Sequence, residues 1–457
     1  MNVDKLLEPQ KAHAKVLLDS LYTNGFAFDA SPTGTGKTYS AAAIAKNLNA
    51  PIVVICPKVS RKNWIDVLAS FGLKTHCVIN YEKLVRGNTI HYAFNKKLYV
   101  NRKYWYDSTG IDIYFPKDAL IIIDECHKCK GPKSKNGEML TALKNFGYKV
   151  LLLSATAATN VTEMRHFGYT TNLHYGRNFY TFAKEHGAEN DGFGGLTFTK
   201  DEEKAKSGMF KIHHTLFNVR KCASKMKIED FGDIFPKNHV IAESFDLGED
   251  GSRKLQKVYD VMADELAALD ARAENYSEHI FAVMMRARRH SELLKVPVTA
   301  EWIIDRFEEG ISPVVFFNFS DSLQAVLNKL GKYKDLITKI IGGQTEKERN
   351  VEIEEFQSNK RRIVLANMNA GAASINLHDI DGKFPRESLI CPSWSAIMTL
   401  QAIGRIYRAN GKSPCVQKFL FASEIEERQR ARVALKVKNI SELHDGDLSL
   451  FDAVPLY

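Results

Sequence analysis

A short segment near the N-terminus combines two glycines, a lysine and two threonines in the order Ser31-Pro-Thr-Gly-Thr-Gly-Lys-Thr38. Glycines let the backbone fold tightly, so that its N–H groups point at the oxygens of a phosphate group. The lysine ammonium can reach the same phosphates, and the final threonine hydroxyl can ligate a magnesium ion. We therefore expect this segment to bind a nucleotide. The expected contacts are Thr33, Gly34, Thr35, Gly36, Lys37 and Thr38.

The residues on either side of this loop predict the elements that position it. An apolar run at residues 26–30 precedes the loop, and an alanine-rich stretch at residues 39–48 follows it. A strand, a tight loop and a helix in that order suit phosphate binding, because the N-terminus of the helix adds its positive dipole end. Ser31 stands where the strict pattern has glycine. Since that position only opens the loop, we expect the departure to matter little.

A second candidate set lies at the end of another apolar run, in Ile121-Ile-Ile-Asp-Glu-Cys-His127. We expect Asp124 to hold a magnesium ion with Thr38, and Glu125 to polarise the water that attacks the terminal phosphate. His127 can link these carboxylates to neighbouring polar groups. An acidic pair at a strand end could also be ordinary surface charge. The phosphate-binding loop in the same chain favours hydrolysis, with ATP and Mg²⁺ as cofactors.

Short apolar runs rich in valine and isoleucine alternate with amphipathic stretches of helical length along the chain. Runs without period-two alternation are typical of parallel strands covered by helices on both faces. The pattern occurs twice, which predicts an α/β fold with two such units. We expect an N-terminal unit at residues 1–240, with a helical and basic insertion at about 170–240, and a C-terminal unit at residues 241–457. The expected strands include residues 26–30, 52–56, 119–123, 150–153, 314–319, 363–366 and 388–390.

A long helix is expected at residues 253–273, where apolar residues recur at helical spacing. We interpret this apolar stripe as core packing. Its members are Leu255, Val258, Val261, Met262, Leu266 and Leu269.

Length, charge and cysteine content restrict the class of protein. The 457 residues suffice for two or three domains, and 63 Lys and Arg against 54 Asp and Glu give a net charge of +9. That charge fits a polyanionic partner, but a well-solvated surface would explain it as well. No apolar stretch approaches the roughly 18 residues of a membrane helix, and acidic residues interrupt every candidate signal sequence. Seven cysteines, an odd number, indicate a reducing compartment, so we expect a cytoplasmic protein.

These motifs, in this order, resemble those of the superfamily 2 helicases, and the similarity runs from about residue 8 to residue 420. The resemblance implies two RecA-like lobes with the ATP site in the cleft between them. Pro9-Gln10 resembles the block whose glutamine, here Gln10, reads adenine. Residues 52–58 with Asn63-Trp64 resemble motif Ia, and residues 78–84 resemble the next block, which abuts DNA.

The same resemblance implies how ATP hydrolysis is coupled to movement. The sequence Asp124-Glu-Cys-His-Lys-Cys-Lys130 matches the D-E-x-H-x-x-K box of the family, and Ser154-Ala-Thr156 matches motif III. By this match His127, Ser154 and Thr156 couple the ATP state to lobe movement. Lys58 and Tyr81 are the implied contacts with the nucleic-acid backbone in the first lobe.

The second lobe carries two further blocks. Residues 365–377 resemble motif V, with Gly371 and Asn376 in place as nucleic-acid contacts. Trp394 is followed by Gln401-Ala-Ile-Gly-Arg-Ile-Tyr-Arg408, which resembles motif VI. The match implies that Gln401 contacts the nucleotide. It also implies that Arg405 and Arg408 reach the γ-phosphate, with Arg408 as the arginine finger.

A closer resemblance, to the annealing-helicase branch of the Swi/Snf-type double-stranded DNA translocases, rests mainly on the middle of the chain. The residues that carry it are Phe179-Tyr-Thr-Phe182, residues 192–195, Leu216-Phe-Asn-Val-Arg220, Pro236 and Met284-Met-Arg-Ala-Arg-Arg-His290. The lysines and arginines in this region could also form a solvated face. The length fits a compact fork-remodelling helicase of phage or viral origin, such as the UvsW type.

Together these features predict an ATP-dependent translocase on branched DNA, which would regress forks, migrate junctions and anneal strands in replication, recombination and repair. We expect sequence-independent binding by a monomer, with Arg220 and residues 204–227 holding the junction arms; for a phage protein the location is the host cytoplasm. Three alternatives remain: an RNA helicase, a strand-separating DNA helicase, and an ATP-gated DNA clamp without turnover. The blocks around Trp64, Tyr81 and Arg220 favour DNA over RNA.

Overall fold

The computed structural model describes residues 5–85, 92–94, 111–192, 194–269, 276–371, 375–393, 395–422 and 426. These residues form two units, the first ending at Gly232 and the second beginning at Asp233. Strand β11 (Asn238–Ser244) pairs along its whole length within the second sheet. The boundary expected near residue 240 therefore falls inside a strand of the second unit.

The first unit is built on a six-stranded sheet with the order β10-β1-β7-β6-β2-β3, in which all neighbouring strands are parallel. Because the strands are parallel, their carboxyl ends share one edge of the sheet, which is where ligands bind in sheets of this kind. The strands are β1 (Phe26–Asp29), β2 (Ile52–Cys56), β3 (Thr75–Asn80), β6 (Leu120–Asp124), β7 (Lys149–Leu153) and β10 (Ala223–Ser224).

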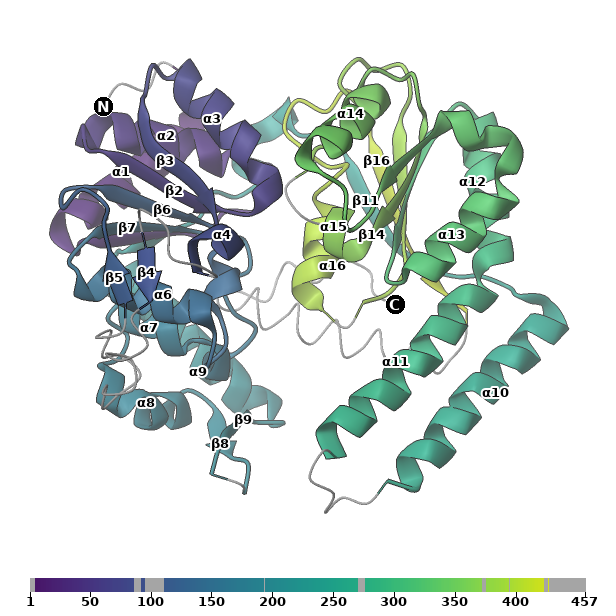
Figure 1. Cartoon of the computed structure of the whole chain (residues 1–457), viewed down its shortest axis with the longest axis horizontal. Coiled ribbons are helices and arrows are strands. Elements are labelled where there is room, and N and C mark those ends of the chain that lie inside the picture. Colours follow the sequence, from purple (N-terminus) through teal and green to yellow (C-terminus); the bar gives the residue numbers. More distant parts are fainter. Residues whose placement is uncertain are drawn as a thin grey trace. The chain divides into compact units, whose positions relative to one another are not determined.

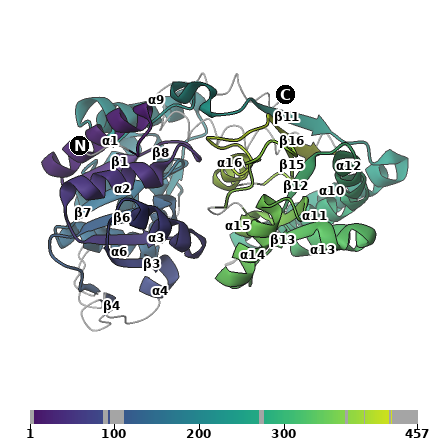
Figure 2. The ribbon, with the colours of Figure 1, turned by 90° about the horizontal axis from the view of Figure 1, so that it is seen from above.

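Helices cover both faces of this sheet, and each face has its own apolar core (Figures 1 and 2). One core includes Leu17, Ile44 and Trp64, and its helices are α1 (Glu8–Thr23), α2 (Lys37–Leu48) and α3 (Arg61–Ser70). The other core includes Leu140 and Met209. Its helices are α4 (Tyr81–Val85), α6 (Lys135–Asn145), α7 (Arg165–Thr170), α8 (Phe179–Glu185) and α9 (Glu202–His214).

Two antiparallel strand pairs and several short helical turns complete the first unit. The pairs are β4 (Tyr92–Phe94) with β5 (Ile111–Ile113), and β8 (Ala188–Asn190) with β9 (Leu196–Phe198). The π-helical turn Thr215–Val219 joins α9 to the segment that leads into β10. The 3₁₀ turns are Lys58–Ser60, Cys126–Cys129, Val161–Glu163, Gly176–Asn178 and, across the unit boundary, Glu229–Ile234.

The second unit repeats the architecture with another parallel six-stranded sheet, in the order β11-β16-β15-β12-β14-β13. Its other strands are β12 (Ser312–Phe317), β13 (Ile337–Ile340), β14 (Ile363–Asn367), β15 (Arg386–Ile390) and β16 (Cys415–Phe421). Helices α12 (Val296–Glu308) and α13 (Ser320–Lys329) cover one face, and α14 (Glu346–Gln357), α15 (Met368–Gly371) and α16 (Ala396–Ile403) cover the other (Figure 1). A 3₁₀ turn, Gly331–Leu336, precedes β13.

All seven strands expected from the sequence are present, with ends that shift by at most two residues. Continuous burial explains why they could be recognised: every residue of β2 and of β12, for example, is buried. The α/β prediction with two parallel sheets flanked by helices is thus confirmed. Among the described helices, none is both long and apolar enough to cross a membrane.

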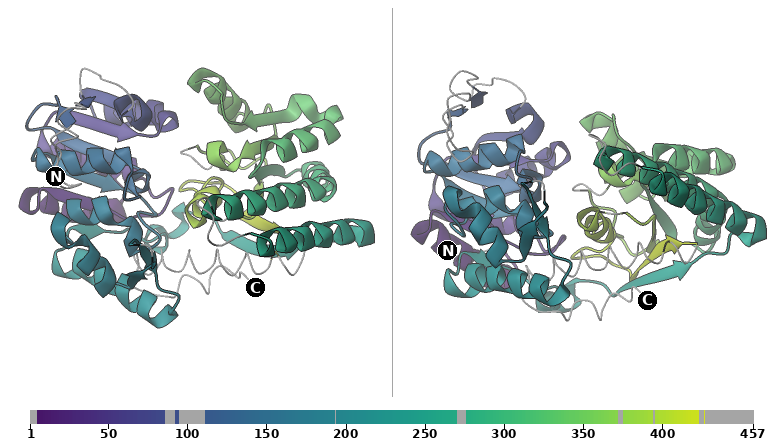
Figure 3. Two further views of the ribbon diagram at one scale, coloured as in Figure 1. Left: turned by 60° about the horizontal axis from the view of Figure 1, so that its bottom comes forward. Right: turned by 90° about the horizontal axis from the view of Figure 1, so that it is seen from below.

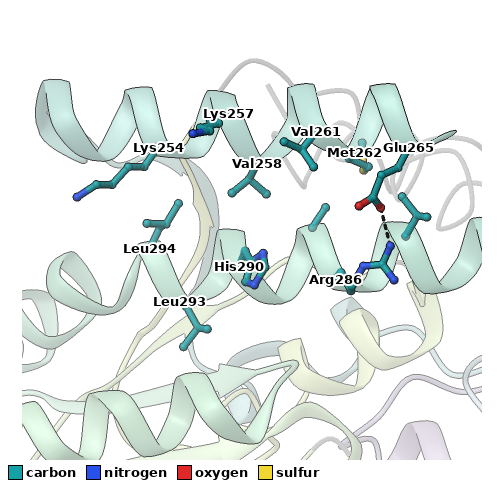
Figure 4. A pocket seen from close by; sticks show the side chains of 12 residues that line it. Lys254, Lys257, Val258, Val261, Met262, Glu265, Arg286, His290, Leu293 and Leu294 are labelled. Carbon is teal, nitrogen blue, oxygen red and sulfur yellow. Dashed lines mark hydrogen bonds and ion pairs between the residues drawn. The ribbon is translucent and has the colours of Figure 1, made fainter. Parts of the chain in front are cut away.

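Helices α10 (Gly248–Ala267) and α11 (Tyr276–Leu294) run side by side as a pair attached to the second unit (Figures 1 and 3). Leu255 and Tyr259 are the buried residues of α10. Val258, Val261 and Met262 instead line a groove of about 550 Å³ between the two helices (Figure 4). The interpretation of this stripe as core packing was therefore wrong for these three side chains, because they face an open groove.

Candidate nucleotide-hydrolysis site

The phosphate-binding loop connects the end of β1, at Asp29, to the start of α2, at Lys37. Gly34 and Gly36 both adopt left-handed backbone conformations, with φ angles of 95° and 85°. Gly36 also needs space, since a Cβ atom there would stand 2.3 Å from Nε2 of Gln10. Glycine is therefore favoured at position 36 by its left-handed backbone, and a Cβ atom there would also displace the end of the Gln10 side chain from Thr35 O.

The lysine of the loop lies over the loop's own carbonyl groups. Nζ of Lys37 donates to the carbonyl oxygens of Ser31 at 2.8 Å and Pro32 at 3.0 Å, and the hydroxyl of Thr35 donates to Pro32 O at 2.9 Å. Thr38 is the second residue of α2, and no acidic residue lies in the first turn of that helix. An ammonium group and a helix N-terminus at one place are complementary to nucleotide phosphates.

Gln10 packs against this loop from α1. Its amide nitrogen donates to Thr35 O at 2.9 Å, and its amide oxygen accepts from Leu7 N at 2.9 Å. Each contact uses one of the two bonds that the amide nitrogen and oxygen can make. Adenine recognition would use the second N–H of the Gln10 amide nitrogen and the second lone pair of its oxygen. The adenine-reading role of Gln10 stays a prediction.

Ser31, which replaces the first glycine of the strict pattern, does not have a left-handed backbone. Its backbone N–H donates to Oδ1 of Asp29 at 2.9 Å, and its hydroxyl accepts from the backbone N–H of Met226 at 3.0 Å. The position therefore does not require glycine, and the serine side chain provides a contact that glycine would lack.

A buried histidine–aspartate pair beneath the loop was not predicted from the sequence. Oδ2 of Asp29 lies 3.0 Å from Nε2 of His13, and Nδ1 of His13 lies 2.8 Å from the hydroxyl of Ser224. Burial alone would raise the pKa of Asp29, but His13, Lys37 and Ser31 together hold that pKa below its ordinary value. The available signal was an acid inside an otherwise apolar strand, because a buried carboxylate needs a partner.

The acidic pair lies at the end of β6, two strands away from β1 in the sheet. Oδ2 of Asp124 accepts a hydrogen bond of 2.9 Å from the indole Nε1 of Trp64. Burial first, and then the charge of Glu125, raise the pKa of Asp124 to about 7, against the opposing effects of Trp64 and Lys37. A half-buried carboxyl whose pKa is raised fits a bound cation, so Asp124 is a suitable ligand for Mg²⁺ together with the expected ligand Thr38.

Tyr81 is not available as a nucleic-acid contact. The side chain is 1% exposed, and its hydroxyl donates to the backbone oxygen of Asp124 at 2.7 Å. The expected contact is thus corrected: because the ring is enclosed beneath the acidic pair, Tyr81 supports the backbone of the hydrolytic residues.

Glu125, His127 and Ser154 come together at the carboxyl ends of β6 and β7. Nδ1 of His127 lies 3.2 Å from Oε2 of Glu125 and 3.2 Å from the hydroxyl of Ser154. The same hydroxyl accepts from the backbone N–H of Thr156 at 3.1 Å, and Ser154 N donates to Asp29 O at 3.0 Å. His127 and Ser154 therefore form a chain of polar contacts between Glu125 and the phosphate-binding strand, and Thr156 is attached to it through the Ser154 hydroxyl.

The arginines of the motif VI block lie together within the second unit. Nη1 of Arg405 and Nη2 of Arg408 both donate to the carbonyl oxygen of Ile375, at 3.3 Å and 3.2 Å. Arg405 is 1% exposed, whereas Arg408 is half-buried, as is Gln401 on α16. The structure thus joins the motif V and motif VI blocks, while their contact with the γ-phosphate stays a prediction. Trp394 lies outside the described residues.

The remaining expected nucleic-acid contacts are spread over both units. Lys58 is exposed directly after β2. Arg220 is half-buried and donates to Thr171 O at 2.9 Å. Asn376 is exposed, with its backbone oxygen accepting from Gln357, and Gly371 ends α15.

Two protein-family models match the chain. The model described as "Type III restriction enzyme, res subunit" covers residues 5–159, and the model described as "Helicase conserved C-terminal domain" covers residues 297–410. The first match contains the phosphate-binding loop and the acidic pair, and the second contains both arginines.

Two relatives agree with these matches. A protein of Acanthamoeba polyphaga mimivirus named ATP-dependent RNA helicase L364 is 30% identical over 459 residues, which cover 97% of this chain and 84% of the relative. The ATP-dependent helicase rhp16 of Schizosaccharomyces pombe is 25% identical over 171 residues, which cover 34% of this chain and 19% of that protein. The first unit holds a site equipped for nucleotide hydrolysis, and the second unit repeats its parallel sheet. Together with the two family models and a relative matched over nearly the whole chain, these features place this protein among the superfamily 2 helicases as an enzyme that hydrolyses ATP.

Proposed function

We propose that this helicase is a DNA translocase that acts on branched DNA, where it regresses forks, migrates junctions and anneals strands. The observation that carries the proposal is the charge of residues 204–227, here called the basic segment. It holds seven Lys and Arg and no Asp or Glu. A run of one charge within a globular unit favours a polyanionic partner over a mixed, solvated surface.

The exposed side chains of α9 support binding to a nucleic-acid backbone. Lys206 and Lys211 are exposed, and Phe210 between them is 47% exposed. The ring of His213 stacks on that of Phe217 at a centroid distance of 4.3 Å. Lysines interleaved with aromatic rings bind phosphates by charge and bases by stacking, so binding should depend strongly on salt and little on sequence.

The nucleotide cycle uses the residues already described. Lys37 and the loop N–H groups would hold the phosphates of ATP, Gln10 and Gln401 would contact the nucleotide, and Thr38 and Asp124 would hold Mg²⁺. The metal ion, when bound, neutralises charge on the phosphates.

Hydrolysis is assigned to three further residues. Glu125 orients the attacking water, and Arg405 and Arg408 stabilise the charge that develops on the γ-phosphate. His127 and Ser154 would pass the state of the acidic pair to β1 through the polar contacts given above, with Thr156 fixing the Ser154 hydroxyl.

A translocase of this kind suits a fork for an energetic reason. A motor that tracks duplex DNA re-pairs complementary strands behind the junction while it unpairs strands ahead, so the net work per base pair is small. The resemblance of residues 179–182 and 216–220 to the annealing branch supports this use. We propose further that the protein works as a monomer in the cytoplasm, where its seven free cysteines stay reduced.

An RNA helicase is the second candidate function. The observation that favours it is the name of the mimivirus relative, which specifies RNA. Both candidates share the same nucleotide site, so the distinction depends on the polymer that stimulates turnover.

The deciding experiment measures ATPase stimulation by single-stranded DNA, duplex DNA, forked DNA and duplex RNA at equal nucleotide concentration. We expect forked DNA to stimulate most, with an apparent affinity that falls steeply between 50 and 200 mM salt, by roughly 10³-fold if about six phosphates are contacted. Stimulation by RNA alone would replace the DNA proposal with the RNA candidate.

A further inference from the structure

The end of the basic segment runs directly into the nucleotide site. Strand β10 pairs in parallel with β1, opposite Phe28 and Asp29. Phe28 N donates to Cys222 O at 2.8 Å, and Ala30 N donates to Ser224 O at 2.9 Å. The strand that delivers the phosphate-binding loop is therefore held on one side by the last residues of the basic segment.

Side chains close this connection into a ring. From Ser224 the path runs through His13 to Asp29, then to the backbone N–H of Ser31, and from the Ser31 hydroxyl to the backbone of Met226. No link in the ring exceeds 3.0 Å. His13 is 4% exposed, and Asp29 and Ser31 are fully buried.

Burial makes the ring resist distortion. A polar group that loses its partner away from water keeps its full desolvation cost, so a shift of residues 222–226 must either break a buried bond or carry the loop along with it. Apolar packing alone would not couple the two segments in this way, because apolar side chains can slide past one another without breaking a directional bond. The three hydrogen bonds of the ring fix position and direction together, and the His13–Asp29 pair adds a polar contact of 3.0 Å.

We propose that Ser224 and His13 are positioning residues which transmit the binding of nucleic acid at the basic segment to the phosphate-binding loop. The inference rests on the proposed function, in which that segment binds the polymer. Neither side chain touches the nucleotide or the acidic pair. Their effect is on how far polymer binding accelerates ATP hydrolysis, and therefore on the ratio of stimulated to basal turnover.

The test uses the full-length protein and compares that ratio among variants. Ser224→Ala removes the hydroxyl and leaves the backbone pairing of β10 intact. We expect the ratio of stimulated to basal turnover to fall about fivefold, in line with the loss of one hydrogen bond. Ser224→Thr keeps a hydroxyl and should restore the ratio. Ser252→Ala, at an exposed serine of α10 outside the basic segment, is the matched control.

His13→Gln provides a second variant at the centre of the ring, and thermal melting checks that it folds. A merely structural role would lower the melting temperature and basal turnover together and leave the ratio unchanged. An unchanged ratio in both Ser224→Ala and His13→Gln overturns the inference.

A double variant, Lys206→Ala with Lys211→Ala, separates this inference from the proposed function. A rise in the Kd for forked DNA confirms that the basic segment binds the polymer. The Ser224→Ala result then tests only whether Ser224 and His13 transmit that binding to the phosphate-binding loop. An unchanged Kd would show that the basic segment does not bind the polymer, and so would a wild-type ATPase that forked DNA does not stimulate. Either result would also overturn the proposed transmission through Ser224 and His13.

Discussion

The indole nitrogen of Trp64 donates a 2.9 Å hydrogen bond to Oδ2 of Asp124, 60 residues further along the chain. Trp64 lies in the motif Ia block, which the sequence associates with DNA, yet its side chain is fully buried in the core beside the acidic pair. The contact fixes one carboxylate oxygen of the expected Mg²⁺ ligand. We infer that Trp64 is a positioning residue of the hydrolytic site.

Trp64→Phe should raise the Mg²⁺ concentration that gives half-maximal ATPase activity by about tenfold, because partners that orient a metal ligand contribute on that scale. Turnover at saturating Mg²⁺ should change less. The measurement is a Mg²⁺ titration of ATPase activity. Trp302→Phe, a buried tryptophan of α12 in the second unit, is the matched control. An equal Mg²⁺ requirement in Trp64→Phe and wild type would contradict this role.

Glu125→Gln should bind ATP as wild type does but hydrolyse it at least about 100-fold more slowly, because the amide cannot accept the proton of the attacking water. Fluorescent-nucleotide titration measures the binding and phosphate release measures the turnover. Glu185→Gln, on the exposed surface of α8, serves as control. Normal turnover by a folded Glu125→Gln protein would remove Glu125 from its role.

Arg408→Ala should lower kcat by about 10³-fold if Arg408 acts as an arginine finger. Arg405→Ala should also impair turnover, and more of its effect should come from lost stability, since the buried Arg405 guanidinium donates to Ile375. Comparing kcat with the melting temperature separates the two effects. The exposed Arg253, on α10, is the control site. A kcat for Arg408→Ala within twofold of wild type would contradict the assignment of Arg408 as the arginine finger.

His174 gives the first unit a predictable dependence of stability on pH. Burial, opposed by backbone hydrogen bonds such as that with Arg165, lowers the pKa of His174 to about 4. The folded state therefore resists protonation more than the unfolded state, whose histidine has a pKa near 6.5. The contribution of neutral His174 to the free energy of unfolding is fully present above pH 6.5. It is lost as pH falls toward 4, which lowers that free energy by up to about 3 kcal/mol.

The measurement for His174 is denaturant unfolding of the full chain between pH 7.5 and 4.5. His174→Gln should flatten the fall in unfolding free energy over that range without abolishing it, because burial also lowers the pKa of His378 to about 4. The same slope in the variant and wild type would show that His174 is not the titrating group.

The sequence was sufficient to predict strands that are buried along their whole length. It was also sufficient to predict motifs whose function depends on neighbouring residues in the chain. Strands such as β2 and β12, and the glycines of the phosphate-binding loop, could be read because local pattern and conformation agree there. Strand β10 could not, because two residues carry no periodicity and the strand exists only through pairing with β1.

Contacts between distant residues explain the other differences. Nothing in the spacing of Trp64, Tyr81 and Asp124 shows that an indole and a phenol converge on one carboxylate residue. The role of Ser31 likewise depends on Met226, 195 residues away. The stripe of α10 has helical spacing, but spacing does not reveal which partner covers it, and Val261 is 46% exposed.

The most direct test of the central claim is a four-stranded model fork with labelled parental and nascent strands, incubated with the protein and ATP. The account predicts that paired nascent strands appear with time and that Glu125→Gln forms none, although it still binds the fork. Release of single strands without nascent pairing, or activity confined to RNA duplexes, would contradict the branched-DNA function.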